Sequence, residues 1–316
     1  MLLLLAYLFI VDLVVVFRFR CVFSATFTIT NQCTYPVWPG LLSGAGTAQL
    51  PTTGFALDSG ASTTISIPTS WSGRIWGRTL CSTDPTTNKF VCITADCGSG
   101  TIECNGAGAV PPATLAEFTL NGANGLDFYD VSLVDGFNLP MLVVPQGGGT
   151  GTGTGSGGNC SATGCVVDLN TACPMAMQVT SATNGNGCVA CKSACETFRE
   201  PMYCCTGAYA TPSTCQPTSY SLLFKNACPR AYSYAYDDGS STFTCAAANY
   251  AITFCPTPAA SQKSSPAAQS ETHPEAPNIS TTASSSSSLR CTSAPFLFVI
   301  TFIATLSIIW LSRLLN

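Results

Sequence analysis

Cysteine is the residue type that offers this chain the most chemistry. Of its 19 cysteines, seventeen lie from Cys33 to Cys255. Thiols at this density either pair as disulfides in an exported protein or bind metal ions, and metal sites of this kind also draw on histidine. The chain has one histidine, His273, which lies in a polar stretch near the C-terminus. The cysteines therefore predict a disulfide framework outside the cytosol, without a metal site or a cofactor.

Carboxylates are the other groups that could do chemistry here. Two carboxyl groups that flank a glycosidic bond can hydrolyse it, because a protonated one donates to the leaving oxygen while an ionised one serves as base or nucleophile. Residues 25–256 carry seven Lys and Arg against thirteen Asp and Glu, a net charge of −6. Such a region should be repelled by nucleic acid and by anionic lipid, which favours a neutral or cationic ligand.

Short strands are the elements that must position these groups. Polar and apolar residues alternate, or apolar residues cluster, in several short segments that Gly, Pro, Asn and Asp separate: residues 26–30, 63–67, 118–120, 132–134, 141–144 and 251–254. This pattern predicts a mainly β fold, either a sandwich or a barrel. Helix is expected only in the cysteine-rich middle, where Cys191 and Cys195 have helical spacing and residues 196–199 extend the turn, and again at residues 220–226.

The N-terminal end predicts export. Residues 2–17 are almost wholly apolar, and the small residues Ser24 and Ala25 follow. This is typical of a signal peptide over residues 1–24, cleaved near Ser24 or Ala25. Arg18 and Arg20 follow the apolar run instead of preceding it, which leaves an uncleaved anchor as the alternative.

The C-terminal end predicts a tether. Residues 257–288 are rich in Ser, Pro, Ala and Thr, which predicts a disordered stalk with a glycosylation sequon at Asn278. Residues 289–316 then combine a polar spacer with a short apolar run. Small residues, a spacer and an apolar tail form the signal for a GPI anchor. A transmembrane helix that ends at Arg313 is the alternative.

Several segments of residues 25–256 together resemble the thaumatin family. They are residues 88–97 (NKFVCITADC), 111–118 (PPATLAEF), 127–141 (DFYDVSLVDGFNLPM), 190–195 (ACKSAC), 203–205 (YCC) and 252–256 (ITFCP). They follow one another in the order of the family, and Asn88 stands where the family signature usually begins with Gly. The resemblance implies a thaumatin-like β-sandwich with disulfide-rich lobes of loops and short helices.

The resemblance also implies how the cysteines pair. The eight expected disulfides are Cys33–Cys255, Cys81–Cys92, Cys97–Cys104, Cys160–Cys245, Cys165–Cys228, Cys173–Cys191, Cys195–Cys204 and Cys205–Cys215. Cys188 is left over. We expect it to be an unpaired, partly buried thiol, with an intermolecular bond or competition with Cys191 for Cys173 as alternatives.

A cleft lined by one arginine and four acids is a further property that the resemblance implies. The acids fall on Glu117, Asp130, Asp135 and Asp237, with the neighbouring Asp238 as the alternative to the last. The arginine position falls on Phe55, so the cation is expected to be missing. Without it, the mutual repulsion of the carboxylates should raise their pKa values.

The resemblance implies a plant defence protein at the outer face of the plasma membrane, or in the cell wall, whose cleft binds β-1,3-glucan of fungal walls as a monomer. In that role the acids hydrogen-bond sugar hydroxyls while Trp76, Tyr129 and Phe137 stack on the sugar rings. One alternative is a weak endo-β-1,3-glucanase with Glu117 as acid and Asp130 as base or nucleophile. The others are a tethered module for protein interaction, and aspartates that only cap turns.

Overall fold

Alternating sequence forms the first sheet of the structure. The computed structural model describes residues 25–147, 158, 160–182, 185, 187–246 and 248–257. In β1 (Ala25–Asn31), Phe27 and Ile29 are buried while the alternating Thr26, Thr28 and Thr30 face outward. The sheet has the order β3 (Ser62–Ile67), β1, β13 (Asn249–Phe254), β8 (Met141–Gln146) and β9 (Thr163–Cys165). The predicted signal peptide, stalk, C-terminal segment and Asn278 lie outside the described residues.

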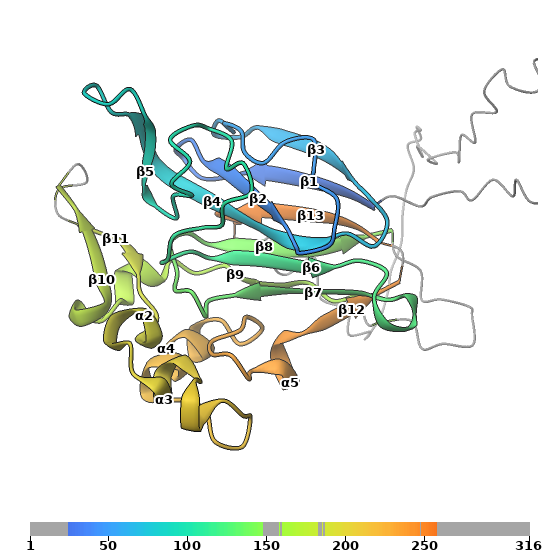
Figure 1. The fold of residues 1–316 in the computed structure, drawn as a ribbon, viewed down its shortest axis with the longest axis vertical. Coiled ribbons are helices and arrows are strands. Elements are labelled where there is room, and N and C mark those ends of the chain that lie inside the picture. Colours follow the sequence, from blue (N-terminus) through green and yellow to red (C-terminus); the bar gives the residue numbers. More distant parts are fainter. Residues whose placement is uncertain are drawn as a thin grey trace, which may run out of the picture. The chain divides into compact units, whose positions relative to one another are not determined.

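A second sheet packs against the first (Figure 1). Its strands run in the order β12 (Phe243–Cys245), β7 (Asp127–Ser132), β6 (Leu115–Thr119), β4 (Ser72–Thr83) and β2 (Trp38–Ser43), and β5 (Phe90–Thr94) pairs with the far end of β4. The strand predicted at residues 132–134 lies earlier in the chain. It ends at Ser132 because a turn follows, in which Gly136 has φ +89° and donates its N–H to Leu133.

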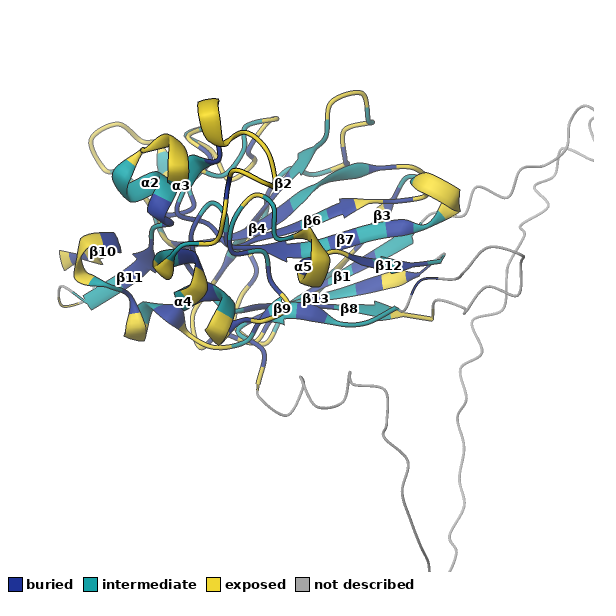
Figure 2. Cartoon of the chain, turned by 90° about the horizontal axis from the view of Figure 1, so that it is seen from below, coloured by how far each residue is buried: buried dark blue, intermediate teal, exposed yellow. Residues whose placement is uncertain are grey.

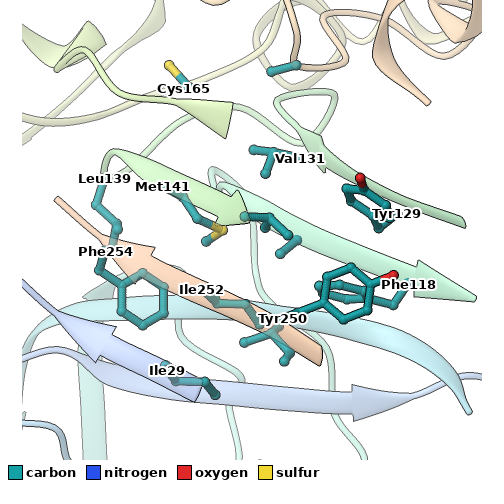
Figure 3. Close-up of a cluster of buried hydrophobic side chains, with 14 of the residues drawn as sticks. Ile29, Phe118, Tyr129, Val131, Leu139, Met141, Cys165, Tyr250, Ile252 and Phe254 are labelled. Carbon is teal, nitrogen blue, oxygen red and sulfur yellow. The ribbon is translucent and has the colours of Figure 1, made fainter. Parts of the chain in front are cut away.

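The main core fills the space between the two sheets. Figure 3 shows Ile29, Ile252 and Tyr250 of the first sheet facing Phe118, Tyr129 and Val131 of the second. The ring centroids of Phe27 and Phe118 are 4.5 Å apart, so aromatic packing joins the sheets directly. The predicted mainly β sandwich is thereby confirmed.

Short helices and one hairpin form a cysteine-rich region at one end of the sandwich (Figure 1). Its elements are η2 (Leu169–Ala172), η3 (Met175–Met177), β10 (Gln178–Ser181), β11 (Gly187–Cys191), α2 (Ala194–Phe198), α3 (Pro201–Cys204), η5 (Gly207–Tyr209) and α4 (Ser219–Ala227). Two further short elements lie beside the second sheet: η1 (Ala123–Gly125) and α5 (Asp238–Ser241).

Capping residues determine where these helices begin. The predicted helix at residues 220–226 is α4, whose Thr218 and Ser221 form a reciprocal capping box. The prediction that Cys191 shares a helix with Cys195 is wrong, because Cys191 ends a strand. The side chain of Ser193 accepts a hydrogen bond from the N–H of Glu196, so the helix starts only at Ala194.

Eight disulfides are present, and they join the pairs that the resemblance implies: Cys33–Cys255, Cys81–Cys92, Cys97–Cys104, Cys160–Cys245, Cys165–Cys228, Cys173–Cys191, Cys195–Cys204 and Cys205–Cys215. Four of them lie wholly within the segment from Cys165 to Cys228. They stabilise a region whose helices are too short to be stable alone.

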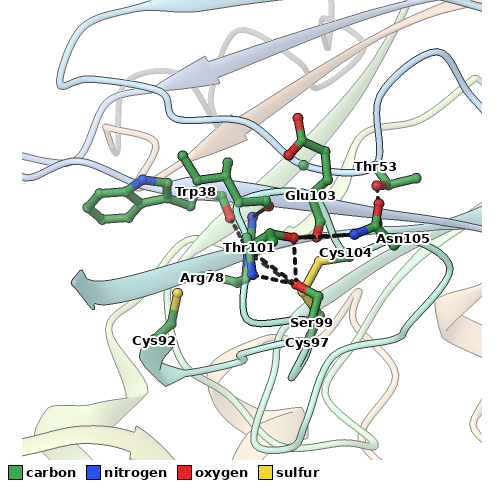
Figure 4. The surroundings of a disulfide bond; sticks show 12 residues. Trp38, Thr53, Arg78, Cys92, Cys97, Ser99, Thr101, Glu103, Cys104 and Asn105 are labelled. Carbon is green, nitrogen blue, oxygen red and sulfur yellow. Dashed lines mark hydrogen bonds between the residues drawn. A yellow bond between two sulfur atoms is a disulfide. The ribbon is translucent and has the colours of Figure 1, made fainter. Parts of the chain in front are cut away.

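A second, smaller core covers one end of the outer face of the second sheet. It contains Trp76, Leu115 and the disulfide Cys97–Cys104. Figure 4 shows Arg78 beside this disulfide, where its buried guanidinium donates to the backbone oxygens of Trp38 and Ile102. The second core covers only this end of the sheet. The rest of the outer face of the second sheet stays open for a site.

Candidate functional site

Three charged side chains form a row across the open part of the second sheet. Arg74 of β4 lies directly opposite Glu117 of β6, and Glu117 lies directly opposite Asp130 of β7. Residues opposite one another in antiparallel strands have Cβ atoms about 4.5–5.5 Å apart and project from the same face. The sheet therefore brings together residues that are far apart in the chain.

An open cleft of about 450 Å³ lies over this row. Its wall is made of parts of β2, β4, β6 and β7: Leu42, Ser43, Gly44, Ala45, Ser72, Gly73, Arg74, Glu117, Phe118, Thr119, Phe128 and Asp130. The lining includes the small residues Ser43, Gly44, Ala45, Ser72 and Gly73 as well as the row and Phe128. Such a cleft suits an extended, hydroxyl-rich ligand better than a compact apolar one.

The expectation that the acids lack an arginine is wrong. The Nε atom of Arg74 lies 3.6 Å from Oε1 of Glu117, and both side chains are partly exposed. Phe55, to which the arginine position was assigned, packs against the main core instead. The cleft therefore contains a cation, and Arg74 lowers the pKa values of Glu117, Asp130 and Asp135.

The two opposed carboxyl groups differ in how strongly they hold a proton. Burial and the neighbouring Glu117 raise the pKa of Asp130 to about 8. Burial also raises the pKa of Glu117, against which the guanidinium of Arg74 acts. At neutral pH Asp130 is therefore the protonated member. This favours the reverse of the predicted roles, with Asp130 as acid and Glu117 as base or nucleophile.

One carboxyl oxygen of Asp130 also lacks a hydrogen-bond partner within the described protein. This atom, Oδ1, is buried. Buried polar atoms almost always have a partner, and the exceptions call for an explanation such as a ligand or water. The atom belongs to a residue that lines the cleft, so a ligand in the cleft is one group that would satisfy it.

The remaining predicted acids have different surroundings. Burial raises the pKa of Asp135, and its charge acts on Glu117, which places it close to the row. Asp237 forms an ion pair of 2.9 Å with Lys225 and accepts two hydrogen bonds from Ser233. Its neighbour Asp238 instead raises the pKa of Asp130. Of the two alternatives, Asp238 is therefore the one that acts on the row.

The three aromatic residues expected to stack on sugar rings are all buried. Trp76, Tyr129 and Phe137 have exposed fractions of 0%, 1% and 0%. Trp76 donates its indole N–H to Ala95, and Tyr129 packs in the main core. Of the two aromatic residues in the cleft lining, Phe118 is buried in the main core, so Phe128 is the one whose ring is partly exposed. Strand alternation predicts this, because Phe128 is two residues before Asp130 and shares its face, whereas Tyr129 points the other way.

Two other features of the described residues bear on function. Within this part of the chain, no three His, Cys, Asp or Glu side chains are arranged to hold a metal ion. Among its helices, none has the length and hydrophobicity that crossing a bilayer requires. Cys188 is unpaired and partly buried, as predicted, and it lies on β11, outside the cleft lining.

Comparison with known proteins identifies relatives over the same region. Residues 31–256 match the Thaumatin family. Thaumatin-like protein 1 of Pyrus pyrifolia is 56% identical over 236 residues, which cover 74% of this chain and 92% of that protein. The glucan endo-1,3-beta-glucosidase of Prunus avium is 54% identical over 234 residues, which cover 74% of this chain and 91% of that protein. The PR5-like receptor kinase of Arabidopsis thaliana is 53% identical over 236 residues, 74% of this chain but only 34% of that protein.

Proposed function

This chain belongs to the thaumatin family, and we propose that it is a defence protein of the cell surface whose cleft binds β-1,3-glucan. The observation that carries this proposal is the open cleft in which Arg74, Glu117, Asp130 and Phe128 share one face of the sheet. The similarity to a protein named glucan endo-1,3-beta-glucosidase supports the same ligand class.

The chemistry of the cleft suits a neutral sugar chain. Carboxyl groups accept hydrogen bonds from hydroxyls, and a protonated carboxyl also donates one. The ring of Phe128, which is partly exposed on the cleft wall, offers an apolar surface on which the face of a pyranose can pack. Arg74 offsets part of the negative charge, so the site does not require a cationic ligand.

Retention on insoluble β-1,3-glucan tests this function. The soluble domain, residues 25–257, is suitable because the Pyrus pyrifolia relative consists of this domain over 92% of its length. We expect the wild-type domain to be retained and Phe128→Ala to be retained at least about fivefold less, as the loss of one stacking contact of about 1 kcal/mol implies. The matched control is Tyr209→Ala, which removes an exposed ring from η5, outside the cleft lining. Failure of the wild-type domain to bind any β-glucan would reject the proposal.

Weak hydrolysis of β-1,3-glucan is a second candidate, and the opposed carboxyl pair favours it. Directly opposite strand positions place the two Cβ atoms about 4.5–5.5 Å apart, which suits the roughly 5–5.5 Å between the carboxyl groups of retaining glycosidases better than the roughly 6.5–9.5 Å of inverting ones. Asp130 would donate the proton and Glu117 would attack. New reducing ends from laminarin that disappear in Glu117→Gln, but not in Glu200→Gln, would support hydrolysis. Glu200 is exposed and is the N-cap residue that precedes α3, outside the cleft lining.

For localisation we propose that a signal peptide over residues 1–24 directs export and that residues 289–316 are exchanged for a GPI anchor. Residues 257–288, with a glycan on Asn278, would then form a stalk between the membrane and the domain. Release from intact cells by a phosphatidylinositol-specific phospholipase tests the anchor. Retention after that treatment would instead favour a transmembrane helix ending at Arg313. A tethered module that presents its cleft to a protein partner is the alternative if no glucan binds.

A further inference from the structure

Glu117 and Asp130 cannot both carry a charge in this cleft without a large cost. They are directly opposed on neighbouring strands, and both carboxyls are shielded from water enough to raise their pKa values. Like charges at this separation repel strongly where the dielectric constant is low. The ion pair formed here is the one between Arg74 and Glu117, which leaves Asp130 as the group without a counter-charge in contact.

The groups that face Asp130 come from four places in the fold. Arg74 of β4 stabilises its ionised form, and Glu117 of β6 opposes it. Asp238, in the first turn of α5, opposes it as well and accepts a hydrogen bond from the hydroxyl of Tyr232. The charge of Asp130 in turn acts on Tyr232, so that hydroxyl is also near. Around this position one cation, Arg74, therefore faces three carboxyl groups, those of Asp130, Glu117 and Asp238.

A single proton, held by Asp130, balances the charges of the row. With Asp130 protonated, Arg74 and Glu117 neutralise each other and the row has no net charge. The buried Oδ1 atom of Asp130, which has no partner in the protein, then belongs to a neutral carboxyl group that exchanges hydrogen bonds with a ligand hydroxyl. If the proton leaves, a ligand that displaces water would bury two adjacent carboxylates, which is unfavourable.

We propose that Glu117 and Asp130 share one proton, in the sense that only one of the two groups ionises and the proton resides on Asp130, and that the cleft captures a neutral β-glucan only while this proton is in place. The proposal rests on the glucan-binding function above and adds its regulation: the cleft releases its ligand in alkaline surroundings. The raised pKa of Asp130, about 8, agrees with the geometry and sets where the change occurs.

Carboxyl carbon NMR of the ligand-free soluble domain tests the shared proton without any glucan. We expect Asp130 to remain protonated at neutral pH and to titrate near pH 8. In Glu117→Gln the opposing charge is gone, so Asp130 should titrate at lower pH. Titration of Asp130 in the ordinary carboxyl range, or no change in Glu117→Gln, would overturn the shared proton whether or not the domain binds glucan.

Glucan retention between pH 6 and pH 10 tests the coupling. For the wild-type domain we expect constant affinity up to about pH 7.5 and then a fall approaching tenfold per pH unit, as release of one proton requires. Asp130→Asn cannot ionise, so the affinity of this variant for glucan should not change across this pH range. Glu117→Gln, as a second variant, leaves a single carboxyl group that can pair with Arg74 when ionised, so the alkaline fall should disappear.

The outcomes separate the two proposals. No retention at any pH rejects glucan binding and its coupling to the proton, while the NMR titration still decides the shared proton. Retention that is independent of pH keeps the proposed function and rejects the coupling. Glucan retention that increases with pH would show that the ionised carboxylates favour binding, which also rejects the coupling.

Discussion

At the scale of single residues, Asp130 connects the stability of the domain with its site. Its pKa in the folded protein, about 8, lies above the ordinary value of 3.8. The folded state therefore binds this proton more tightly than the unfolded state does. The stability that this proton contributes is fully present below about pH 4 and is progressively lost as the pH rises from there to about 8.

The substitution Asp130→Asn should therefore stabilise the domain in a pH-dependent way. Asn cannot ionise, so the cost of a buried charge beside Glu117 disappears. We expect the free energy of unfolding at pH 8 to increase by about 1–3 kcal/mol over the wild type, with little difference at pH 4. Denaturant unfolding at the two pH values, with the disulfides intact, measures this. An equal effect at both pH values would indicate a change in packing and not in ionisation.

Arg74 has the opposite influence on the same row. Its removal in Arg74→Gln takes away the charge that lowers the pKa values of Glu117, Asp130 and Asp135. We expect all three groups to titrate at higher pH in carboxyl carbon NMR. Arg230→Gln is the control, because Arg230 lies over the ring of Phe243 and is not among the charges that act on these acids. Unchanged titration in Arg74→Gln would show that solvent already screens the arginine.

Cys188 illustrates a residue whose chemistry is suppressed by its surroundings. Burial raises the pKa of the thiol, and its Sγ atom contacts the backbone oxygen of Ala190. The soluble domain should therefore take up one iodoacetamide label slowly at pH 7.5 and faster at pH 9.5. Cys188→Ser should take up none and unfold within about 0.5 kcal/mol of the wild type. More than one label per domain, measured by mass spectrometry, would contradict the pairing of the other sixteen cysteines.

At the scale of secondary-structure elements, Lys225 joins α4 to the segment that carries Asp238. Its ammonium group lies 2.9 Å from Asp237 and donates to Ser241 and to the backbone oxygen of Ala231. The two side chains of the ion pair are 19% and 11% exposed, so solvent screens it little. The short helix α5 is otherwise mostly exposed (yellow in Figure 2), so the contacts of Lys225 with Asp237 and Ser241 help to anchor it.

Loss of that anchor should disturb both stability and the site. In Lys225→Met the carboxylate of Asp237 stays buried without its partner, a change that typically costs about 3–5 kcal/mol. We expect a loss near the lower end of this range in denaturant unfolding, together with weaker glucan retention as Asp238 moves. The double variant Lys225→Met with Asp237→Asn should recover part of the stability. No recovery would show that the packing of the lysine chain, and not the ion pair, is what matters.

At the scale of the whole molecule, the sequence predicts the sandwich and its bridges better than the cleft. Alternation at residues 26–30 and 251–254 predicts strands that exist. Arg74 was missed because its place beside Glu117 depends on the pairing of β4 with β6, which lie far apart in the chain. Trp76 was wrongly chosen because exposure depends on which end of the outer face the second core covers, whereas alternation with Asp130 was a signal that could have identified Phe128.

Among the eight disulfides, Cys33–Cys255 should contribute most to the free energy of unfolding of the domain. It closes a loop of 222 residues, whereas Cys195–Cys204 closes one of 9. Even with Cys160–Cys245 shortening the path, the first loop stays above roughly 100 residues, so a loop-entropy model gives about 5 kcal/mol for it and about 2.5 kcal/mol for the second. Replacing each pair by alanine and measuring denaturant unfolding tests this difference. Similar losses would mean that β1 and β13, which pair along Phe27 to Asn31, already associate in the unfolded chain and leave the bridge little entropy to remove.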